Sequence, residues 1–402
     1  MIATPVLLLA LVAAGPGPMP GQAPRSAEMC GVCHSEVRVT FEASVHAVEG
    51  IRCSSCHGGD PSATTVAAAH RGDFRGVPRR RDTPALCASC HADIARMRPY
   101  NLPTDQLALY QTSRHGRRLA EGDDRVAVCT DCHGAHDIRR RSDPQSRVFP
   151  ANIPATCARC HADAALMARY GLKASAFDDY SKSVHGKAFL VKGDRSAPEC
   201  TRCHGSHGAT PPGVGDVDKV CGQCHATTRA FFVQGPHMAA MQAAGLPECA
   251  SCHDHHQVQA AGPALLDTAC LKCHDQDSDQ VRLAQTFKTL FAGAAEEIDK
   301  ARALVDQAAA VPFYVEDYRA RLEEARTSLT ESYPAMHALE VTPVRDLTAQ
   351  ARGIAREVES EVEAKLKGLG WRRVGLLVFW FYLLLTVAVL ARFRRRAAQE
   401  PR

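Results

Sequence analysis

The stretch Cys-Thr-Asp-Cys-His-Gly-Ala-His, at residues 129–136, decides the class of this chain. Two cysteines are separated by two residues, and a histidine directly follows the second cysteine. The same Cys-x-x-Cys-His pattern occurs nine times, and the nine motifs contain all eighteen cysteines of the chain. The motifs are Cys30/Cys33/His34, Cys53/Cys56/His57, Cys87/Cys90/His91, Cys129/Cys132/His133, Cys157/Cys160/His161, Cys200/Cys203/His204, Cys221/Cys224/His225, Cys249/Cys252/His253 and Cys270/Cys273/His274.

Cys-x-x-Cys-His is the attachment signature of c-type haem. The two thiols form thioethers with the porphyrin, and the adjacent histidine binds the iron from the proximal side. Zinc ribbons, disulfides and redox dithiols also use paired cysteines, but none of them requires this histidine. With 19 histidines in 402 residues, nine such placements by chance have a probability on the order of 10⁻¹². The motifs therefore predict nine covalently attached haem c groups.

Nine haems within residues 30–274 leave about 27 residues for each haem. So little protein cannot enclose each macrocycle separately, so the haems must pack against one another as the core. This accounts for an aromatic content of only 6%, while 45% apolar residues exclude disorder. We expect a mainly α fold with much irregular structure, in which short helices carry the motifs. A net charge of +4 argues against a nucleic-acid partner.

The haem region is built from repeats. The segment that begins at Cys87 recurs at Cys157, with an offset of 70 that becomes 71 after one inserted residue. Each copy contains two attachment motifs, a Ser-x-His-Gly sequence between them and a histidine three residues after the second motif. Shorter versions run from Cys30 to His57 and from Cys221 to His253, and the ninth motif stands alone. Two-haem units repeated in this way predict a chain of haems built by duplication.

Ten histidines lie outside the motifs. If histidine binds both faces of every iron, nine distal ligands are needed. His136 follows proximal His133 by only three residues and cannot reach the opposite face of the same ring, so it should bind a different haem, as should His207. Surface positions are the alternative for each histidine, but the repeat register favours ligation. The predicted distal ligands are His46, His70, His115, His136, His185, His207, His237, His255, His256 and His337, with His255 and His256 as alternatives for one position.

His337 is the only histidine after His274. It lies close to Pro334, at an expected helix junction, where a side chain can be directed towards a neighbouring element. We predict that it is the distal ligand of one haem and that it ties the helical segment to the haem domain. The alternative is a solvent-exposed histidine at a helix end.

Two apolar segments predict export and membrane anchoring. Residues 1–24 read as a signal peptide, because Ile2–Ala14 is apolar and too short to span a bilayer. No Lys or Arg precedes Arg25, so an uncleaved N-terminal anchor is the alternative. Val374–Ala391 has no charge and would be about 27 Å long as a helix.

The expected organisation follows from these segments. A nine-haem domain at 25–278 precedes a helical segment at 279–370, a single transmembrane helix at 371–392 and a cytoplasmic tail at 393–402. Apolar residues recur at helical spacing from Phe287 and again from Val344, with Pro312, Pro334 and Pro343 as punctuation. Bacterial haem attachment occurs outside the cytoplasmic membrane, so the haem domain should face the periplasm from the inner membrane.

The Cys-x-x-Cys-His-Gly-x-His segments, with a preceding Ser-x-His-Gly, resemble exported multihaem cytochromes c, a group with tetrahaem and octahaem members. The resemblance covers residues 30–274. The helical segment that follows is similar to the helical tail of pentahaem nitrite reductases and hydroxylamine oxidoreductases. It also resembles membrane-anchored cytochromes that take electrons from a quinol-oxidising cytochrome b. A simple stalk between the haems and the anchor is the alternative.

Two functions compete at this point. The first is respiratory electron transfer between a membrane cytochrome b, or another quinol-oxidising subunit, and soluble periplasmic redox proteins. The second is reduction of a nitrogen or sulfur oxyanion at one open haem. The nitrite reductases that the chain resembles replace one motif histidine with lysine, which no motif here does; the hydroxylamine oxidoreductases keep histidine but leave a distal face open. The ligand count favours an electron carrier or complex subunit over an enzyme, and no catalytic residue is predicted.

Overall fold

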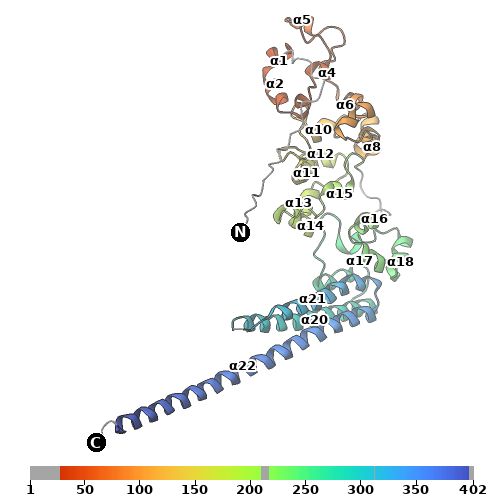
Figure 1. Ribbon diagram of the computed structural model, residues 1–402. Coiled ribbons are helices and arrows are strands. Elements are labelled where there is room, and N and C mark those ends of the chain that lie inside the picture. Colours follow the sequence, from red (N-terminus) through yellow and green to blue (C-terminus); the bar gives the residue numbers. More distant parts are fainter. Residues whose placement is uncertain (1–27, 210–216, 312, 398–402) are drawn as a thin grey trace, which may run out of the picture. The chain divides into compact units, whose positions relative to one another are not determined.

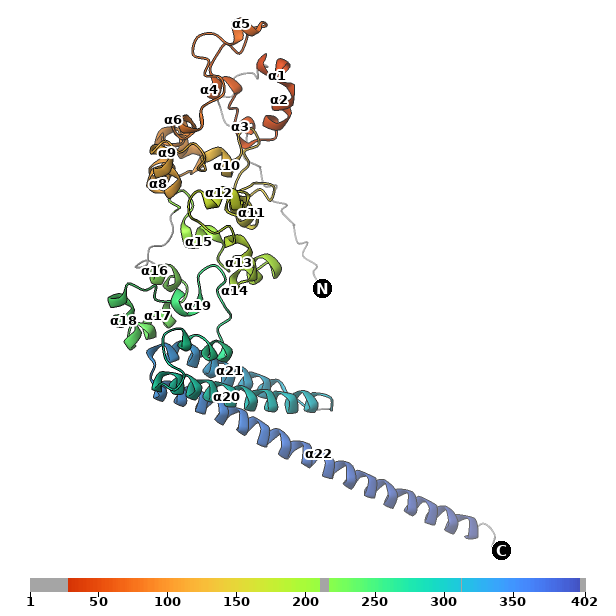
Figure 2. The same cartoon turned by 180° about the vertical axis from the view of Figure 1, so that it is seen from behind.

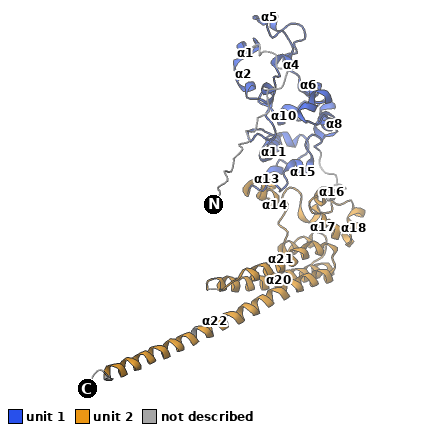
Figure 3. Cartoon of the chain, in the orientation of Figure 1, with its two compact units in different colours: residues 1–177, 193–211 blue, residues 178–192, 212–402 orange. Residues whose placement is uncertain are grey.

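The computed structural model describes residues 28–209, 217–311 and 313–397. This part of the chain is helical and irregular, without strands, so the expected mainly α fold is confirmed. The chain divides into two compact units, shown in Figure 3: residues 1–177 with 193–211, and residues 178–192 with 212–402. The predicted signal peptide lies outside the described residues.

The first unit consists of short helices joined by loops. The attachment motifs lie on these helices or at their C-terminal ends. Its elements are α1 (Cys30–Cys33), α2 (Ser35–Glu42), α3 (Val45–Val48), α4 (Cys53–His57), α5 (Val66–Ala69), η1 (Arg80–Asp82), α6 (Thr83–His91), α7 (Ile94–Met97), η2 (Arg98–Tyr100), α8 (Gln106–Thr112), α9 (Arg114–Ala120), α10 (Cys129–His133), η3 (Pro150–Asn152), α11 (Ile153–His161), α12 (Ala164–Ala168) and α15 (Cys200–His204).

The second unit combines short helices of the same kind with three long ones (Figure 1). Its elements are α13 (Ala176–Lys182), which begins two residues before the unit, α14 (Val184–Gly186), η4 (Lys187–Val191), α16 (Val217–Gly222), α17 (Ala226–Phe232), α18 (Pro236–Ala244), α19 (Ala250–His253), η5 (Pro263–Asp267), η6 (Cys270–Lys272), α20 (Asp279–Ala309), α21 (Glu316–Ala335), η7 (Met336–Ala338) and α22 (Val341–Ala397).

The long helices form a three-helix bundle. α20, α21 and the first half of α22 pack side by side, as Figures 1 and 2 show. Apolar residues recur every three or four positions along each helix, so each buries one continuous stripe. The side chains of Phe287, Phe291, Ile298, Leu322 and Val358 are almost completely buried in this core. The bundle is thus an ordinary side-chain core, unlike the haem-motif region.

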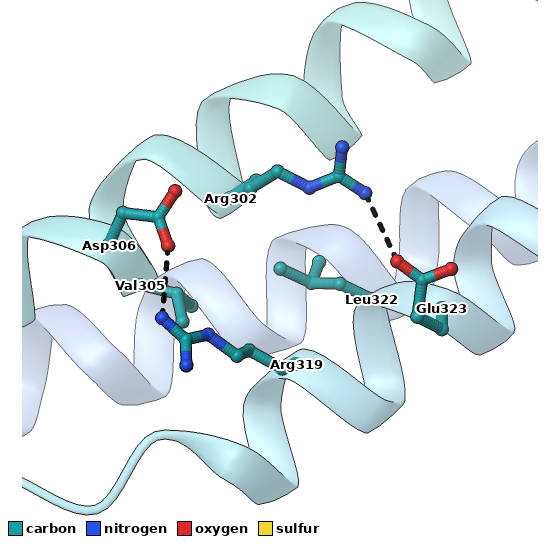
Figure 4. Close-up of a pocket in the computed structure, with 6 residues that line it drawn as sticks. All are labelled: Arg302, Val305, Asp306, Arg319, Leu322 and Glu323. Atoms are coloured by element: carbon teal, nitrogen blue, oxygen red, sulfur yellow. Dashed lines mark hydrogen bonds and ion pairs between the residues drawn. The ribbon is translucent and has the colours of Figure 1, made fainter. Parts of the chain in front are cut away.

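The surface hollow between α20 and α21 belongs to the bundle (Figure 4). Its rim holds two ion pairs between the helices, Arg302 with Glu323 and Asp306 with Arg319, each at 3.4 Å. Val305 and Leu322 lie beneath them. The four charged groups are thus paired across the two helices, and Arg319 also pairs with Glu316 on its own helix.

Two of the three prolines lie at helix ends, as the sequence pattern predicts. Pro334 lies in the last turn of α21, and the helix ends one residue later, at Ala335. Pro343 lies in the first turn of α22, where its missing N–H leaves no helical hydrogen bond unmade. Pro312 lies outside the described residues. α22 is therefore one helix of 57 residues that runs from the bundle through the apolar segment without a break at 370.

α22 is the single described helix that is long and apolar enough to cross a membrane. Its apolar window has a mean hydropathy of 2.5, and none of that window is buried against the rest of the protein. Large apolar side chains such as Leu377 and Phe381 are each 70% exposed. Exposure of this extent on a soluble surface would be costly, so the segment is suited to a bilayer.

Candidate functional site

Histidine pairs are the main feature of the haem-motif region. Within the described residues, eight motif histidines each face one histidine from outside the motifs, with ring centroids 6.0–6.3 Å apart. The pairs are His34–His70, His46–His91, His57–His136, His115–His161, His133–His207, His185–His225, His237–His274 and His253–His337.

The separation within these pairs fits a metal held between two imidazoles. Bonds of about 2 Å from an iron to a nitrogen on each side, with the rings added, place the centroids about 6 Å apart. Rings in direct contact lie closer, as the centroids of the sequence neighbours His255 and His256 do at 4.8 Å. A uniform gap in eight pairs, with a motif histidine in each, is the geometry that a two-histidine haem site requires.

The electrostatics of the pairs favour the neutral ring, which is the form that binds metals. Burial lowers the pKa of His133 to about 4, and the adjacent His207 adds to the effect. Burial and then His91 lower the pKa of His46, and burial and then His337 lower that of His253. These rings therefore present a lone pair at neutral pH.

The attachment cysteines form no disulfides: all eighteen are thiols. Within two of the repeats, cysteines of successive motifs are hydrogen-bonded to each other, Cys87 to Cys129 and Cys157 to Cys200. In both pairs this hydrogen bond is the main cause that raises the pKa of the first thiol and lowers the pKa of the second. The two motifs of such a repeat therefore lie directly beside each other.

The second cysteine of five motifs is exposed, which differs from what a core built around the attachment positions would suggest. These exposed cysteines are Cys33, Cys132, Cys203, Cys224 and Cys273, whereas the first cysteine of every motif is half-buried. The polypeptide alone therefore leaves these five residues accessible. A thioether requires a sulfur that the porphyrin can reach, and an exposed cysteine meets this requirement. That these five cysteines attach haem stays a prediction.

The first unit has no continuous side-chain core of its own among its described residues. Its fully buried apolar side chains are scattered, and the cluster of Leu119, Val126 and Val128 is small. A chain with this little self-packing needs another apolar filling. Porphyrins beside the thiols and between the paired histidines would provide it, so the residues present fit haem on three independent counts.

The Ser-x-His-Gly sequence has a structural explanation. Ser113 caps α9, and its Oγ accepts a hydrogen bond of 2.9 Å from the backbone N–H of Gly116. A Cβ at Gly116 would collide with the carbonyl oxygen of Tyr110, so only glycine fits there. The serine fixes the start of the helix and the glycine lets it approach the preceding one, so His115 is held in one direction. Ser183 and Gly186 repeat this arrangement around His185.

The glycine after a motif also has a conformational role. Gly134 and Gly205 end their motif helices with φ of 87° and 79°, a region that residues with a Cβ rarely adopt. After these turns, His136 and His207 face proximal histidines of other motifs, His57 and His133. Asp254 takes the same position in the fourth repeat, with φ of 62°.

Acidic residues that cap the motif helices were not identified from the sequence. Asp131 accepts a hydrogen bond from the backbone N–H of Val128 at 2.7 Å, and Glu199 accepts one from Thr201 at 2.7 Å. Glu28 accepts one from Cys53 at 2.8 Å. An acidic group at a helix N-terminus stabilises the helix. The first two could have been found from their places beside a motif cysteine; Glu28, 25 residues away, could not.

The other three histidines belong to different units. His204 lies in the first unit, and His255 and His256 lie in the second. With the eight pairs, they complete the nineteen histidines of the chain. Every predicted site residue thus falls in the described part, and the pairs bring together all of the predicted distal ligands except His255 and His256.

Comparison with known proteins agrees with this geometry. The family model Cytochrome c3 matches residues 45–162 and 124–226, and the model Cytochrome c554 and c-prime matches residues 220–297. No curated protein and no solved structure matches the chain. The two families support a multihaem c-type cytochrome with covalently bound haem c.

Proposed function

We propose that this multihaem c-type cytochrome carries nine haem c groups and passes electrons between a quinol-oxidising subunit of the membrane and soluble redox proteins of the periplasm. The observation that supports it best is the set of eight histidine pairs with centroids 6.0–6.3 Å apart. Bound haem would supply reversible one-electron chemistry at its iron. We assign the ninth distal position to one of the two neighbouring histidines, His255 or His256.

The histidine pairs determine which kind of chemistry the chain can support. A histidine on each face leaves no coordination position for a substrate, so the pairs favour electron transfer. The alternative is a reductase of a nitrogen or sulfur oxyanion, similar to nitrite reductases or hydroxylamine oxidoreductases, and it requires one open face. At eight of the nine motifs a histidine lies where that substrate would bind.

The proposed location rests on α22. We place its apolar segment in the inner membrane as a single span, with the haem domain in the periplasm and the C-terminal residues in the cytoplasm. The physical support is the uncharged run Val374–Ala391 and its exposed side chains. A leader at residues 1–24 would direct the motif region to the compartment where haem is attached.

The quinol-oxidising step is assigned to a partner. Val374–Ala391 contains no histidine, so this segment cannot hold a haem within the bilayer. Electrons from the membrane quinone pool would then need either a polytopic subunit, for example a cytochrome b, or a haem of this chain that lies at the membrane surface; we assign the step to the polytopic subunit. We propose that the chain is one subunit of such a complex.

Quinol oxidation by the isolated chain tests this assignment. We expect the full-length protein, purified alone in mild detergent, to show negligible haem reduction on the timescale of seconds after a soluble quinol is added, as followed by visible absorption. Dithionite is the matched control, because it should reduce the same sample completely. Rapid reduction by quinol in the absence of any partner would show that the chain itself reacts with quinol.

A further inference from the structure

The histidine pairs follow a rule along the sequence. The first four repeats each contain a leading and a trailing motif, whose proximal histidines are His34 and His57, His91 and His133, His161 and His204, and His225 and His253. The ninth motif, with His274, stands as the leading motif of an incomplete fifth repeat. Each complete repeat also has an intervening histidine between its two motifs: His46, His115, His185 and His237.

Intervening histidines pair forwards. In all four cases, the intervening histidine of one repeat faces the leading motif of the next repeat. The ring centroids lie 6.0–6.2 Å apart in His46–His91, His115–His161, His185–His225 and His237–His274. No intervening histidine faces a motif of its own repeat in these pairs.

Histidines three residues after a trailing motif pair backwards. His136, of the second repeat, faces trailing His57 of the first repeat at 6.1 Å. His207, of the third repeat, faces trailing His133 of the second repeat at 6.0 Å. In the first repeat, the corresponding residue is Asp60. No trailing motif precedes the first repeat, so a histidine at this position would have no earlier haem to bind. The sequence therefore lacks this histidine at the one place where the rule makes it unnecessary.

The rule provides no partner for the first leading motif or for the last trailing motif. At each of these two motifs, the partner is a histidine from outside the repeats. Leading His34 has no repeat before it, and it faces His70 at 6.3 Å. Trailing His253 is followed by no trailing motif, and it faces His337 at 6.2 Å. His70 is fixed by stacking on Phe74, at 4.2 Å between centroids.

His337 is directed by its backbone contacts. Its Nδ1 lies 3.0 Å from the carbonyl oxygen of Tyr333 and 3.2 Å from that of Pro334, so the N–H is used there. The other ring nitrogen is left for a metal. Because η7 packs against α17 and the bundle, the ring has few alternative orientations.

We propose that the distal ligands are exchanged between neighbouring repeats in both directions, that His70 and His337 close the two ends, and that His256 rather than His255 is a ligand. The proposal rests on the nine-haem function above. His256 follows its motif histidine by three residues, as His136 and His207 do, whereas His255 follows it by two. The rule accounts for nine of the ten histidines outside the motifs and leaves His255 over.

Such an exchange has a physical consequence. Where the first repeat meets the second, and the second meets the third, one ligand runs forwards and one backwards, so two coordinate bonds would clamp each of these junctions. Each repeat then completes its sites only when its neighbours are in place. Short helices with little side-chain core would be held in register by these bonds.

A combination of substitutions tests the direction of exchange. We expect His115→Ala to create one high-spin ferric haem in nine, read by low-temperature EPR. Adding Cys157→Ala and Cys160→Ala, which remove the haem of the next repeat, should abolish that signal. Adding Cys87→Ala and Cys90→Ala, which remove the leading haem of the same repeat, should leave it. The reverse pattern would overturn the rule.

A second pair of variants does not depend on the loss of a haem. His256→Ala should create one high-spin haem that binds cyanide, while the adjacent control His255→Ala should remain fully low-spin. A high-spin haem in His255→Ala with none in His256→Ala would contradict the assignment. Failure of the underlying function is recognised separately, because it would appear in the unsubstituted protein as a haem content other than nine or as a high-spin signal.

Discussion

Replacing His337 with alanine should convert one haem of nine from low spin to high spin and allow cyanide to bind it. His337 is half-buried, and its ring lies 6.2 Å from that of His253. An alanine there leaves one face of the iron open, because His337 is the only histidine after His274 and the bundle has no second imidazole to replace it. The measurement is EPR of the oxidised protein, together with the visible spectrum before and after cyanide is added.

The same variant tests the connection between the bundle and the motif region. η7, which carries His337, packs against α17, α21 and α22. His255→Ala is the matched control, since it removes an imidazole from the same unit at a position outside the proposed ligand set. If His337→Ala stays fully low-spin and cyanide does not bind, His337 is not a ligand.

Ending the chain after Gly368 should release the protein from membranes into the soluble fraction. The bundle core extends to Val362, and Leu366 packs against it, so this truncation preserves the core. It removes the whole uncharged segment, whose transfer into lipid provides the anchoring free energy. The measurement is the distribution of haem-stained protein between membrane and soluble fractions.

A shorter truncation is the control for this result. Ending the chain after Ala397 removes only residues 398–402 and should leave the protein in the membrane fraction. If the Gly368 truncation also remained in the membrane after a carbonate wash, the N-terminal apolar segment would be the anchor, which is the alternative reading of residues 1–24.

Sequence reasoning predicted the fold class well, because the nine motifs constrain it strongly. Helical periodicity from Phe287 and Val344 predicted the long helices, and both stripes are buried. Local patterns could not predict the continuity of α22, since a proline in a first turn is compatible with a helix. The sequence boundary at residue 370 therefore has no counterpart as a helix end.

The candidate site was only partly predictable. His136 lies only three residues from His133, and this short distance along the chain was enough to predict that it binds another haem; in the structure it faces His57. Which histidine meets which motif depends on contacts between distant segments, and no local pattern contains these. His70 shows this limit: nothing near it in the sequence indicates His34, from which it is 36 residues away.

The exposure of individual motif cysteines also could not be predicted from the local sequence. Cys203, Cys224 and Cys273 occupy the same motif position as Cys56 and Cys90, yet the first three are exposed and the last two are half-buried. All five follow the same Cys-x-x-Cys-His pattern, so the pattern alone does not predict which of these cysteines are exposed.

The roles of Ser113 and Gly116 could be explained only with the structure in hand. Their recurrence at an offset of 70 marks them as part of the repeat. Their function as helix cap and close-approach residue depends on the position of the Tyr110 carbonyl, which spacing alone does not reveal.

Low-temperature EPR of the oxidised, unsubstituted protein, quantified against total haem, tests the central claim most directly. All nine haems should contribute low-spin ferric signals, because the proposed ligand set has a histidine on each face of every iron. A high-spin ferric signal that integrates to about one haem in nine would contradict it and would favour an oxyanion reductase with one open site.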